Sequence, residues 1–433
     1  MNDSDRQQRE FAENLFARLI GIVRVSKLDY ASSRFQSGSS AEKRARELIL
    51  EAIAQPDSLN CDLYRRKAQQ FGIVDISPNA AAWLEKAEKD YSIRKLMIEQ
   101  EMAQCQASAI REQLRRCYLD AAAVSIARGE TSSGKQFLQQ CKEYCGNIKQ
   151  NVEVSLASIE LALITSDWNA ASSILNRNEL LVLLKDDTGS VEASKVRAAH
   201  GLLALSQSSN LQAAAHHFLS VSASLGDSFN TVVHVEEIST YAIVCSLASF
   251  SRDDLKQFVL GNDRAKALLE LQPGLYEVVQ NTVNGRYAEA REAIDRIRCD
   301  LVLDEFIAPS VDAIYRGIQT RSMVSYITPY VVADLRIMAG TFKRSLQDIV
   351  KDVAELISLK AVSGRIDAQE LTYTKYTDDP RKAALSRILD DGRNFLVESR
   401  SLLMRSALIK ADVVARADMV RAPIQDRVDV QEK

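Results

Sequence analysis

The chain has 433 residues and a formal net charge of −3, and 46% of its residues are hydrophobic and 26% charged. Its 16 glycines and 7 prolines are too few for a loop-rich all-β protein, and the small net charge excludes a global basic field for nucleic acid or an anionic membrane. The sequence contains neither an apolar run of about 18 residues nor a signal peptide. Seven scattered cysteines indicate reduced thiols, so we expect a soluble protein of the cytoplasm and nucleus.

Residues 1–95 predict an N-terminal helical region, and residues 96–300 predict a solenoid of helical repeats. In the second region, polar breaks between amphipathic helices recur at intervals of about 35 to 42 residues, the period of tetratricopeptide and HEAT repeats. A single helix pair cannot bury its apolar face alone, so the pairs must stack. We therefore expect a mainly α fold with a right-handed, TPR/HEAT-like solenoid. The breaks fall at Gly129, Ser166, Ser208, Phe250 and Gly285.

The pattern changes over residues 301–380. We expect Thr328 to be the N-cap, and Pro329 the first residue, of a helix over residues 329–339, because proline lacks the amide that a first turn leaves unpaired. The helix is expected to end at Gly340, a residue suited to a left-handed C-cap.

A second helix and a hairpin follow. Ser345 and Asp348 have the spacing of a capping box, which predicts the start of a helix over residues 345–360. The segment "GRIDAQELTYTKYT" alternates with period two and predicts two short strands. Two short helices followed by a hairpin make a winged helix.

A long helix is predicted over residues 381–418, with a flexible tail at 419–433. Over its main part, residues 381–417, it would be about 55 Å long. Its apolar residues repeat every seven positions, a stripe that favours packing against partner helices. An equally open alternative is that the helix folds back on its own domain. The stripe consists of Ile388, Phe395, Leu402 and Ile409, with Leu389, Leu396 and Leu403 beside it.

No arrangement typical of catalysis is visible. The segment "GETSSGKQ", residues 129–136, matches the G-x-x-x-x-G-K part of a phosphate loop, but Gln136 replaces the magnesium-binding Ser or Thr and a helix precedes it. We interpret it as a turn between helices. The four histidines lack metal-ligand spacing, and Cys141 and Cys145, one helical turn apart, have no second pair of ligands. We expect no enzyme activity, no cofactor and no metal.

DNA binding through the second helix of the winged helix is also disfavoured. Residues 345–360 carry Lys351 and Lys360 against Asp348, Asp352 and Glu355, so a net negative helix would face the phosphates. The hairpin could instead offer a strand edge to a neighbouring protein.

The sequence resembles the PCI family, which is shared by the proteasome lid, the COP-nine signalosome and a translation initiation factor complex. The resemblance covers roughly residues 10 to 412, and it is strongest to the signalosome members. It is carried by "NCDLY" at 60–64, by the segment from 141 to 168, by "ILDDGRNFLVESRSLLMRSALI" at 388–409, and above all by "LVLDEFIAPSVDAIYRGIQTRSMVSYITPYVVADLRIMAGTF" at 301–342.

The resemblance implies a non-catalytic scaffold. Members of the family join through winged-helix edges and a bundle of C-terminal helices, in complexes such as the one whose separate metalloprotease subunit removes the ubiquitin-like modifier from cullins. The expected partners are therefore other PCI subunits, with cullin-RING ligases as a further possibility. An alternative is that the aromatic residues at 326, 330 and 395 fill this chain's own core. The residues expected at interfaces are Tyr326, Pro329, Tyr330, Leu371, Tyr373, Ile388, Phe395, Leu402 and Ile409.

Overall fold

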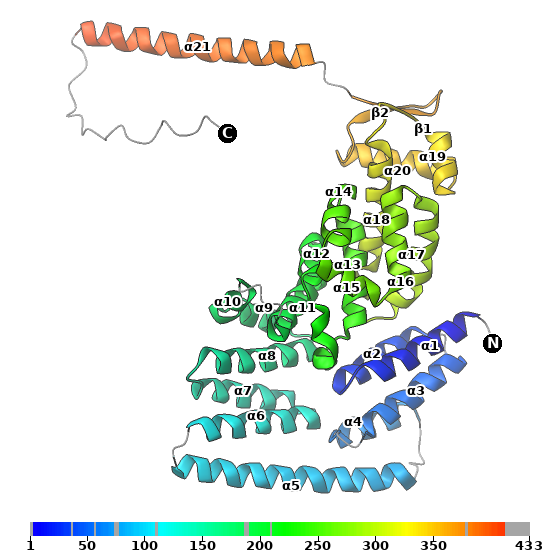
Figure 1. Ribbon diagram of the computed structural model, residues 1–433, viewed down its shortest axis with the longest axis vertical. Coiled ribbons are helices and arrows are strands. Elements are labelled where there is room, and N and C mark those ends of the chain that lie inside the picture. Colours follow the sequence, from blue (N-terminus) through cyan, green and yellow to red (C-terminus); the bar gives the residue numbers. More distant parts are fainter. Residues whose placement is uncertain are drawn as a thin grey trace.

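The structure is a computed structural model that describes residues 3–35, 38–55, 58–72, 78–108, 111–185, 190–207, 210–376 and 380–411. It is an arch of helices with a small sheet at one end and a separate helix beyond the sheet (Figure 1). The mainly α fold class, with helical repeats followed by a winged helix, is confirmed. None of the helices in the described ranges is long and apolar enough to cross a membrane.

Four helices at the N-terminus share one apolar core. These helices also bury residues from the start of the next helix, including Leu84, and from a distant loop, Leu303. The N-terminal unit therefore packs against a part of the chain that follows it by more than 200 residues. Its elements are α1 (Asp3–Arg18), α2 (Ile22–Arg34), α3 (Ser40–Ile53) and α4 (Cys61–Gln70).

The middle of the chain is a series of stacked helices. The helix α5 (Pro78–Ser108) connects the N-terminal unit to this series, and the predicted boundary at residue 95 falls inside it. The division of the chain at residues 95, 300, 380 and 418 stays a prediction. The helices that follow are α6 (Arg111–Arg128), α7 (Thr131–Glu143), α8 (Ile148–Ile164), α9 (Trp168–Leu175), α10 (Asn178–Lys185), α11 (Val191–Ser206), α12 (Leu211–Leu219), η1 (Ala223–Phe229), α13 (Val235–Ser249), α14 (Arg252–Asp254), the π-helical η2 (Leu255–Leu260), α15 (Asp263–Glu270), α16 (Pro273–Asn284) and α17 (Tyr287–Val302).

Three of the predicted breaks share one turn geometry. Gly129, Ser166 and Gly285 all have positive φ angles. In each turn this residue donates to the carbonyl three positions back, and the next residue donates to the carbonyl five positions back. This Schellman arrangement satisfies carbonyl groups that the end of a helix leaves unpaired. The break at Phe250 also lies between two helices, whereas Ser208 lies outside the described residues.

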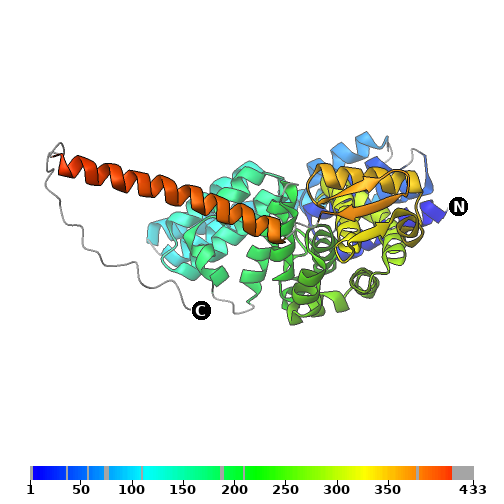
Figure 2. The same cartoon turned by 90° about the horizontal axis from the view of Figure 1, so that it is seen from above.

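A winged helix follows the repeats. Its three-stranded antiparallel sheet has the order β1-β3-β2, with Val332 opposite Thr374 and Ile366 opposite Tyr373. Figure 2 looks down onto this sheet, with the last helix extending away from it. The elements are η3 (Ala308–Ser310), α18 (Val311–Ile327), β1 (Val332–Asp334), α19 (Leu335–Phe342), α20 (Leu346–Ser358), β2 (Gly364–Asp367) and β3 (Thr372–Lys375).

The predicted helix over residues 329–339 is wrong. Thr328 is the C-cap of the preceding helix, and its hydroxyl donates to the Val324 carbonyl at 2.6 Å. The next helix, α19, begins only at Leu335, because Val331 and its neighbours pair with the sheet and Asp334 provides the N-cap. Gly340 lies inside this helix, and Lys343 is the left-handed residue at its end.

The helices and strands predicted after α19 are present in the structure. Ser345 caps α20 and accepts a hydrogen bond from the Asp348 amide at 3.2 Å. Both predicted strands are present as β2 and β3, although Leu371 precedes the strand with a φ of 53°. The last helix is confirmed as α21 (Pro380–Lys410), and residues 412–433 lie outside the described ranges.

Candidate functional site

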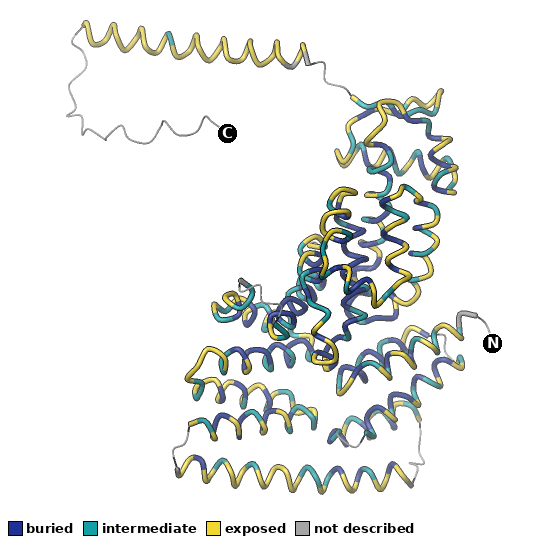
Figure 3. Tube along the Cα trace, viewed as in Figure 1, coloured by how far each residue is buried: buried dark blue, intermediate teal, exposed yellow. Residues whose placement is uncertain are grey.

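The most exposed apolar feature of the molecule is the long helix α21. Each of its residues whose burial the structure describes is exposed, except the half-buried Ser399 (Figure 3). The seven-residue stripe is no exception, with Ile388, Phe395, Leu402 and Ile409 exposed at 66%, 68%, 64% and 60%. The helix does not fold back on its own winged helix in this structure. The alternative in which Phe395 fills the chain's own core therefore finds no support in this structure.

The aromatic residues that precede the sheet are divided between core and surface. Tyr326 is half-buried, with ring centroids 6.3 Å from Tyr287 and 5.7 Å from Phe342. The ring centroids of Tyr330 and Tyr326 lie 5.5 Å apart, but 46% of the Tyr330 surface is exposed. Pro329 is also exposed. Tyr326 thus belongs largely to this chain's own core, while Pro329 and Tyr330 lie on the surface.

Tyr373 is a core residue, contrary to its expected interface role. Its ring is fully buried, its hydroxyl donates to the Ser363 carbonyl at 2.8 Å, and the ring lies directly against Gly364. Its strand, β3, is the central one, so its main chain is paired on both sides. We therefore do not expect Tyr373 to contact a partner directly. Leu371 is half-buried, and its carbonyl accepts from the Leu335 amide at 3.0 Å.

The free edges of the sheet belong to β1 and β2, and β1 is the apolar one. Val331 and Val332 are exposed at 56% and 57%, next to the exposed Tyr330. The other edge, β2, has the sequence "GRID" and is polar. Sequence reasoning missed β1 because it assigned these residues to a helix. The signal was present in Tyr330, Val331 and Val332, an aromatic residue followed by a β-branched pair, because residues of these types favour a strand.

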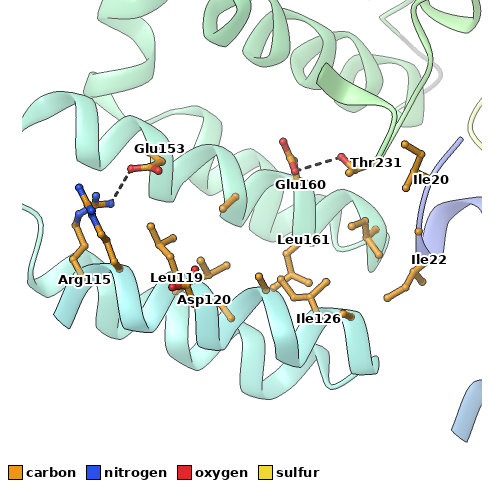
Figure 4. A pocket seen from close by; sticks show the side chains of 18 residues that line it. Ile20, Ile22, Arg115, Leu119, Asp120, Ile126, Glu153, Glu160, Leu161 and Thr231 are labelled. Carbon is orange, nitrogen blue, oxygen red and sulfur yellow. Dashed lines mark hydrogen bonds and ion pairs between the residues drawn. The ribbon is translucent and has the colours of Figure 1, made fainter. Parts of the chain in front are cut away.

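A groove with a volume of about 800 Å³ lies between α6, α8 and the residues before α2 (Figure 4). Its centre is apolar. At one end Arg115 donates to Glu153 at 2.8 Å, and at the other Thr231 donates to Glu160 at 3.4 Å. Apolar lining residues include Ile20, Ile22, Leu119, Ile126 and Leu161.

Only the start of the segment resembling a phosphate loop is a turn between two helices, because residues 131–136 already belong to α7. It links α6 and α7 with no preceding strand, and the Lys135 ammonium pairs with Asp167 at 3.0 Å. Gly134 lies in close contact with α6, because a Cβ there would lie 3.0 Å from the Ile126 side chain. Both glycines therefore have structural explanations.

The histidines and cysteines show no metal site. Within the described residues, no group of three or more His, Cys, Asp and Glu side chains could hold a metal ion. The Cys141 and Cys145 thiols donate to the carbonyls of Arg115 and Cys141, each at 3.4 Å. Burial raises the pKa of Cys141 to about 12, so that thiol stays protonated at neutral pH.

Comparison with known proteins identifies the architecture. A family model described as the PCI domain matches residues 294–372, which include the winged helix, and a model described as 26S proteasome subunit RPN7 matches residues 80–258. The chain contains a PCI domain. The resemblance expected from the sequence is confirmed.

The chain is similar to COP9 signalosome subunits from different eukaryotes. COP9 signalosome complex subunit 1 of Arabidopsis thaliana is 28% identical over 92% of this chain and 89% of the relative. Subunit 1b of Drosophila melanogaster is 27% identical over 77% of this chain and 64% of the relative. Subunit 1 of Emericella nidulans is 26% identical over 93% of this chain and 83% of the relative.

Proposed function

We propose that this chain is a non-catalytic scaffold subunit of a COP9 signalosome. In this role it supports the removal of a ubiquitin-like modifier from cullins by a metalloprotease in another subunit. The observation that carries the proposal is the unpartnered helix α21, on a PCI-domain protein that is similar along most of its length to signalosome subunits. Its partners are other PCI subunits, and cullin-RING ligases are further candidates.

The exposed stripe of α21 is suited to a helical bundle. The helix has 31 residues, which corresponds to about 46 Å at 1.5 Å per residue. An apolar stripe repeated every seven residues faces one direction when helices coil around one another. Burying one such large side chain stabilises an assembly by about 1.5–3 kcal/mol. Because Leu389, Leu396 and Leu403 form a second apolar row beside the stripe, more than one partner helix is needed to cover α21.

The strand β1 provides a second contact. An edge strand leaves main-chain groups free to pair with a strand from another protein. The apolar side chains of Val331 and Val332 flank that edge, whereas β2 presents Arg365 and Asp367. We therefore place the partner strand along β1, with Pro329 and Tyr330 beside it.

The charge of the helix α20 does not suit a DNA-recognition helix. Asp348, Asp352 and Glu355 outnumber Lys351 on it, and Arg344 is paired with Asp352. We propose no role in nucleic-acid binding and none at a membrane. The protein would act in the cytoplasm and nucleus, where the complex meets its substrates.

The alternative is a scaffold subunit of the proteasome lid or of a translation initiation factor complex. The match of residues 80–258 to the RPN7 family favours the lid among these two. That match covers the repeats only up to residue 258 and leaves α21 outside, whereas the signalosome relative from Arabidopsis thaliana is similar over 92% of the chain.

Affinity purification of the tagged chain from its own cells, followed by mass spectrometry, tests the proposal. We expect the other signalosome subunits, including the metalloprotease, to co-purify in constant ratio. A matched variant that ends at residue 376 should lose most of them while keeping its fold. Recovery of lid subunits would establish the alternative, and recovery of the full chain alone would overturn both.

A further inference from the structure

Four of the seven cysteines gather in one apolar cluster where α5, α6 and α7 meet. They are Cys105, Cys117, Cys141 and Cys145, packed with Leu114, Tyr118 and Val154. The other three, Cys61, Cys245 and Cys299, lie apart from this cluster. The helix packing thus brings together thiols from separate elements.

Two of these thiols are in direct contact across helices. The Cys105 and Cys117 sulfur atoms lie 3.9 Å apart, with Cys105 on α5 and Cys117 on α6. A disulfide bond is about 2.05 Å long, so side-chain rotation with a small helix shift brings the atoms within bonding distance. The Cys141 and Cys145 thiols are instead both directed at main-chain carbonyls.

We propose that Cys105 and Cys117 form a thiol–disulfide pair, which a peroxide oxidises to a disulfide joining the end of α5 to α6. The Cys105 sulfur first attacks one peroxide oxygen, which breaks the O–O bond and gives a sulfenic acid and water. The Cys117 sulfur then attacks the sulfenic sulfur. The S–S bond forms as the S–O bond breaks, and the leaving hydroxide takes the Cys117 proton as a second water.

The positions of the two cysteines in their helices determine which of them reacts first. Cys105 lies within the last turn of α5, which ends at Ser108, and helix ends open locally at low free energy. Cys117 lies inside α6, more than one turn from its first residue, Arg111, and burial and then the neighbouring Cys105 raise its pKa to about 11. Cys117 therefore stays a thiol until the sulfenic acid is presented to it.

The disulfide would affect the connection between the N-terminal unit and the repeats. The helix α5 is the link between the N-terminal unit and the repeats, and much of its middle is exposed (Figure 3). A covalent bond from its end to α6 would fix the angle at which this link leaves the repeats. Oxidation would in this way stiffen the connection between the two parts of the solenoid.

The test treats the full, folded chain with a small molar excess of hydrogen peroxide. Free thiols are then alkylated, and the protein is digested with trypsin without reduction. The sequence places Cys105 on peptide 96–111, Cys117 on 117–128, Cys141 on 136–142 and Cys145 on 143–149, so mass spectrometry resolves every pairing. We expect peptides 96–111 and 117–128 to be joined, with a loss of two hydrogens that dithiothreitol reverses.

Matched variants complete the experiment. Cys299→Ser removes an exposed thiol and should leave the cross-link intact, whereas Cys105→Ser should abolish it without creating another disulfide. The wild-type peptide map decides the question even if Cys105→Ser folds poorly. The proposal is overturned if peroxide links other cysteines preferentially, or if it modifies Cys299 alone.

Discussion

Lys27 forms an ion pair with Glu237 at 2.7 Å, although 210 residues separate them in the sequence. The lysine is fully buried and also lies 3.4 Å from Asp304 and over the ring of Phe306. Burial opposes its charge, but the two carboxylates outweigh that effect and raise the pKa of Lys27 above its usual value. A buried cation thus joins the N-terminal unit to α13 and to the loop before α18.

Replacing Lys27 with methionine is expected to destabilise the protein by about 3–5 kcal/mol, because it leaves two buried carboxylates without their cation. Urea denaturation followed by circular dichroism measures the change. The control is Lys86→Met at an exposed position on α5, which should shift the midpoint very little. Equal midpoints for the two variants would show that Lys27 does not hold the N-terminal unit in place.

Two aspartates on the stripe of α21 should abolish assembly without affecting the isolated subunit. Phe395→Asp with Leu402→Asp buries charge only when partner helices cover the stripe, and each unpaired buried carboxylate costs several kcal/mol. We expect an unchanged melting temperature and a loss of co-purifying subunits. Asn394→Asp with Ser401→Asp adds the same charge on a neighbouring face and serves as the control. A large drop in the melting temperature of the isolated double variant would contradict the bundle.

Two glycines of the winged helix should respond to alanine with opposite signs. At Gly364 a Cβ would lie 2.4 Å from the buried ring of Tyr373, and overpacking of this kind costs about 1–3 kcal/mol. At Gly340, inside α19, a Cβ would meet no atom within 4 Å outside the neighbouring residues and the helix's own backbone, so alanine should stabilise the helix by about 0.5–1 kcal/mol. Differential scanning calorimetry of the two variants should therefore show melting temperatures on opposite sides of the wild-type value.

His200 should make the protein less stable in mild acid. Burial, together with the neighbouring His217, lowers the pKa of His200 to about 4, whereas the unfolded side chain titrates near 6.5. Below about pH 6.5 the unfolded state binds the proton and the folded state does not, so stability falls as the pH decreases from about 6.5 to 4. Melting temperatures at pH 7.5 and 4.5 should differ less for His200→Gln than for the wild type. The exposed His216→Gln serves as the control, and identical pH profiles for all three proteins would refute the assignment.

Local sequence signals predicted the features that depend on local chemistry. The turns at Gly129, Ser166 and Gly285 and the cap at Ser345 involve residues only a few positions apart, which a pattern can reveal. The helix expected from Pro329 failed because the Val331 carbonyl accepts from the Lys375 amide at 2.8 Å, a partner that lies in a later strand.

The difference between local signals and contacts with distant residues also explains which parts of the candidate site could be predicted. The stripe of α21 could be predicted from its seven-residue period, and no other residue that the structure describes covers it. Tyr373 was misplaced because period two shows that alternate residues share a face, but not which face is buried. No sequence pattern marks the buried cation of Lys27, because its partners Glu237 and Asp304 are distant in the sequence and meet it only in the folded chain.

The long separation between Lys27 and Glu237 has a consequence for biosynthesis. At ribosomal rates of about 5–20 residues per second, about 10 to 40 s pass between the synthesis of the lysine and that of its first carboxylate partner. The helices α1–α4 have a core of their own and can form early, but their docking surface on α13 does not yet exist. The first helices to leave the ribosome are thus expected to be among the last to reach their final position.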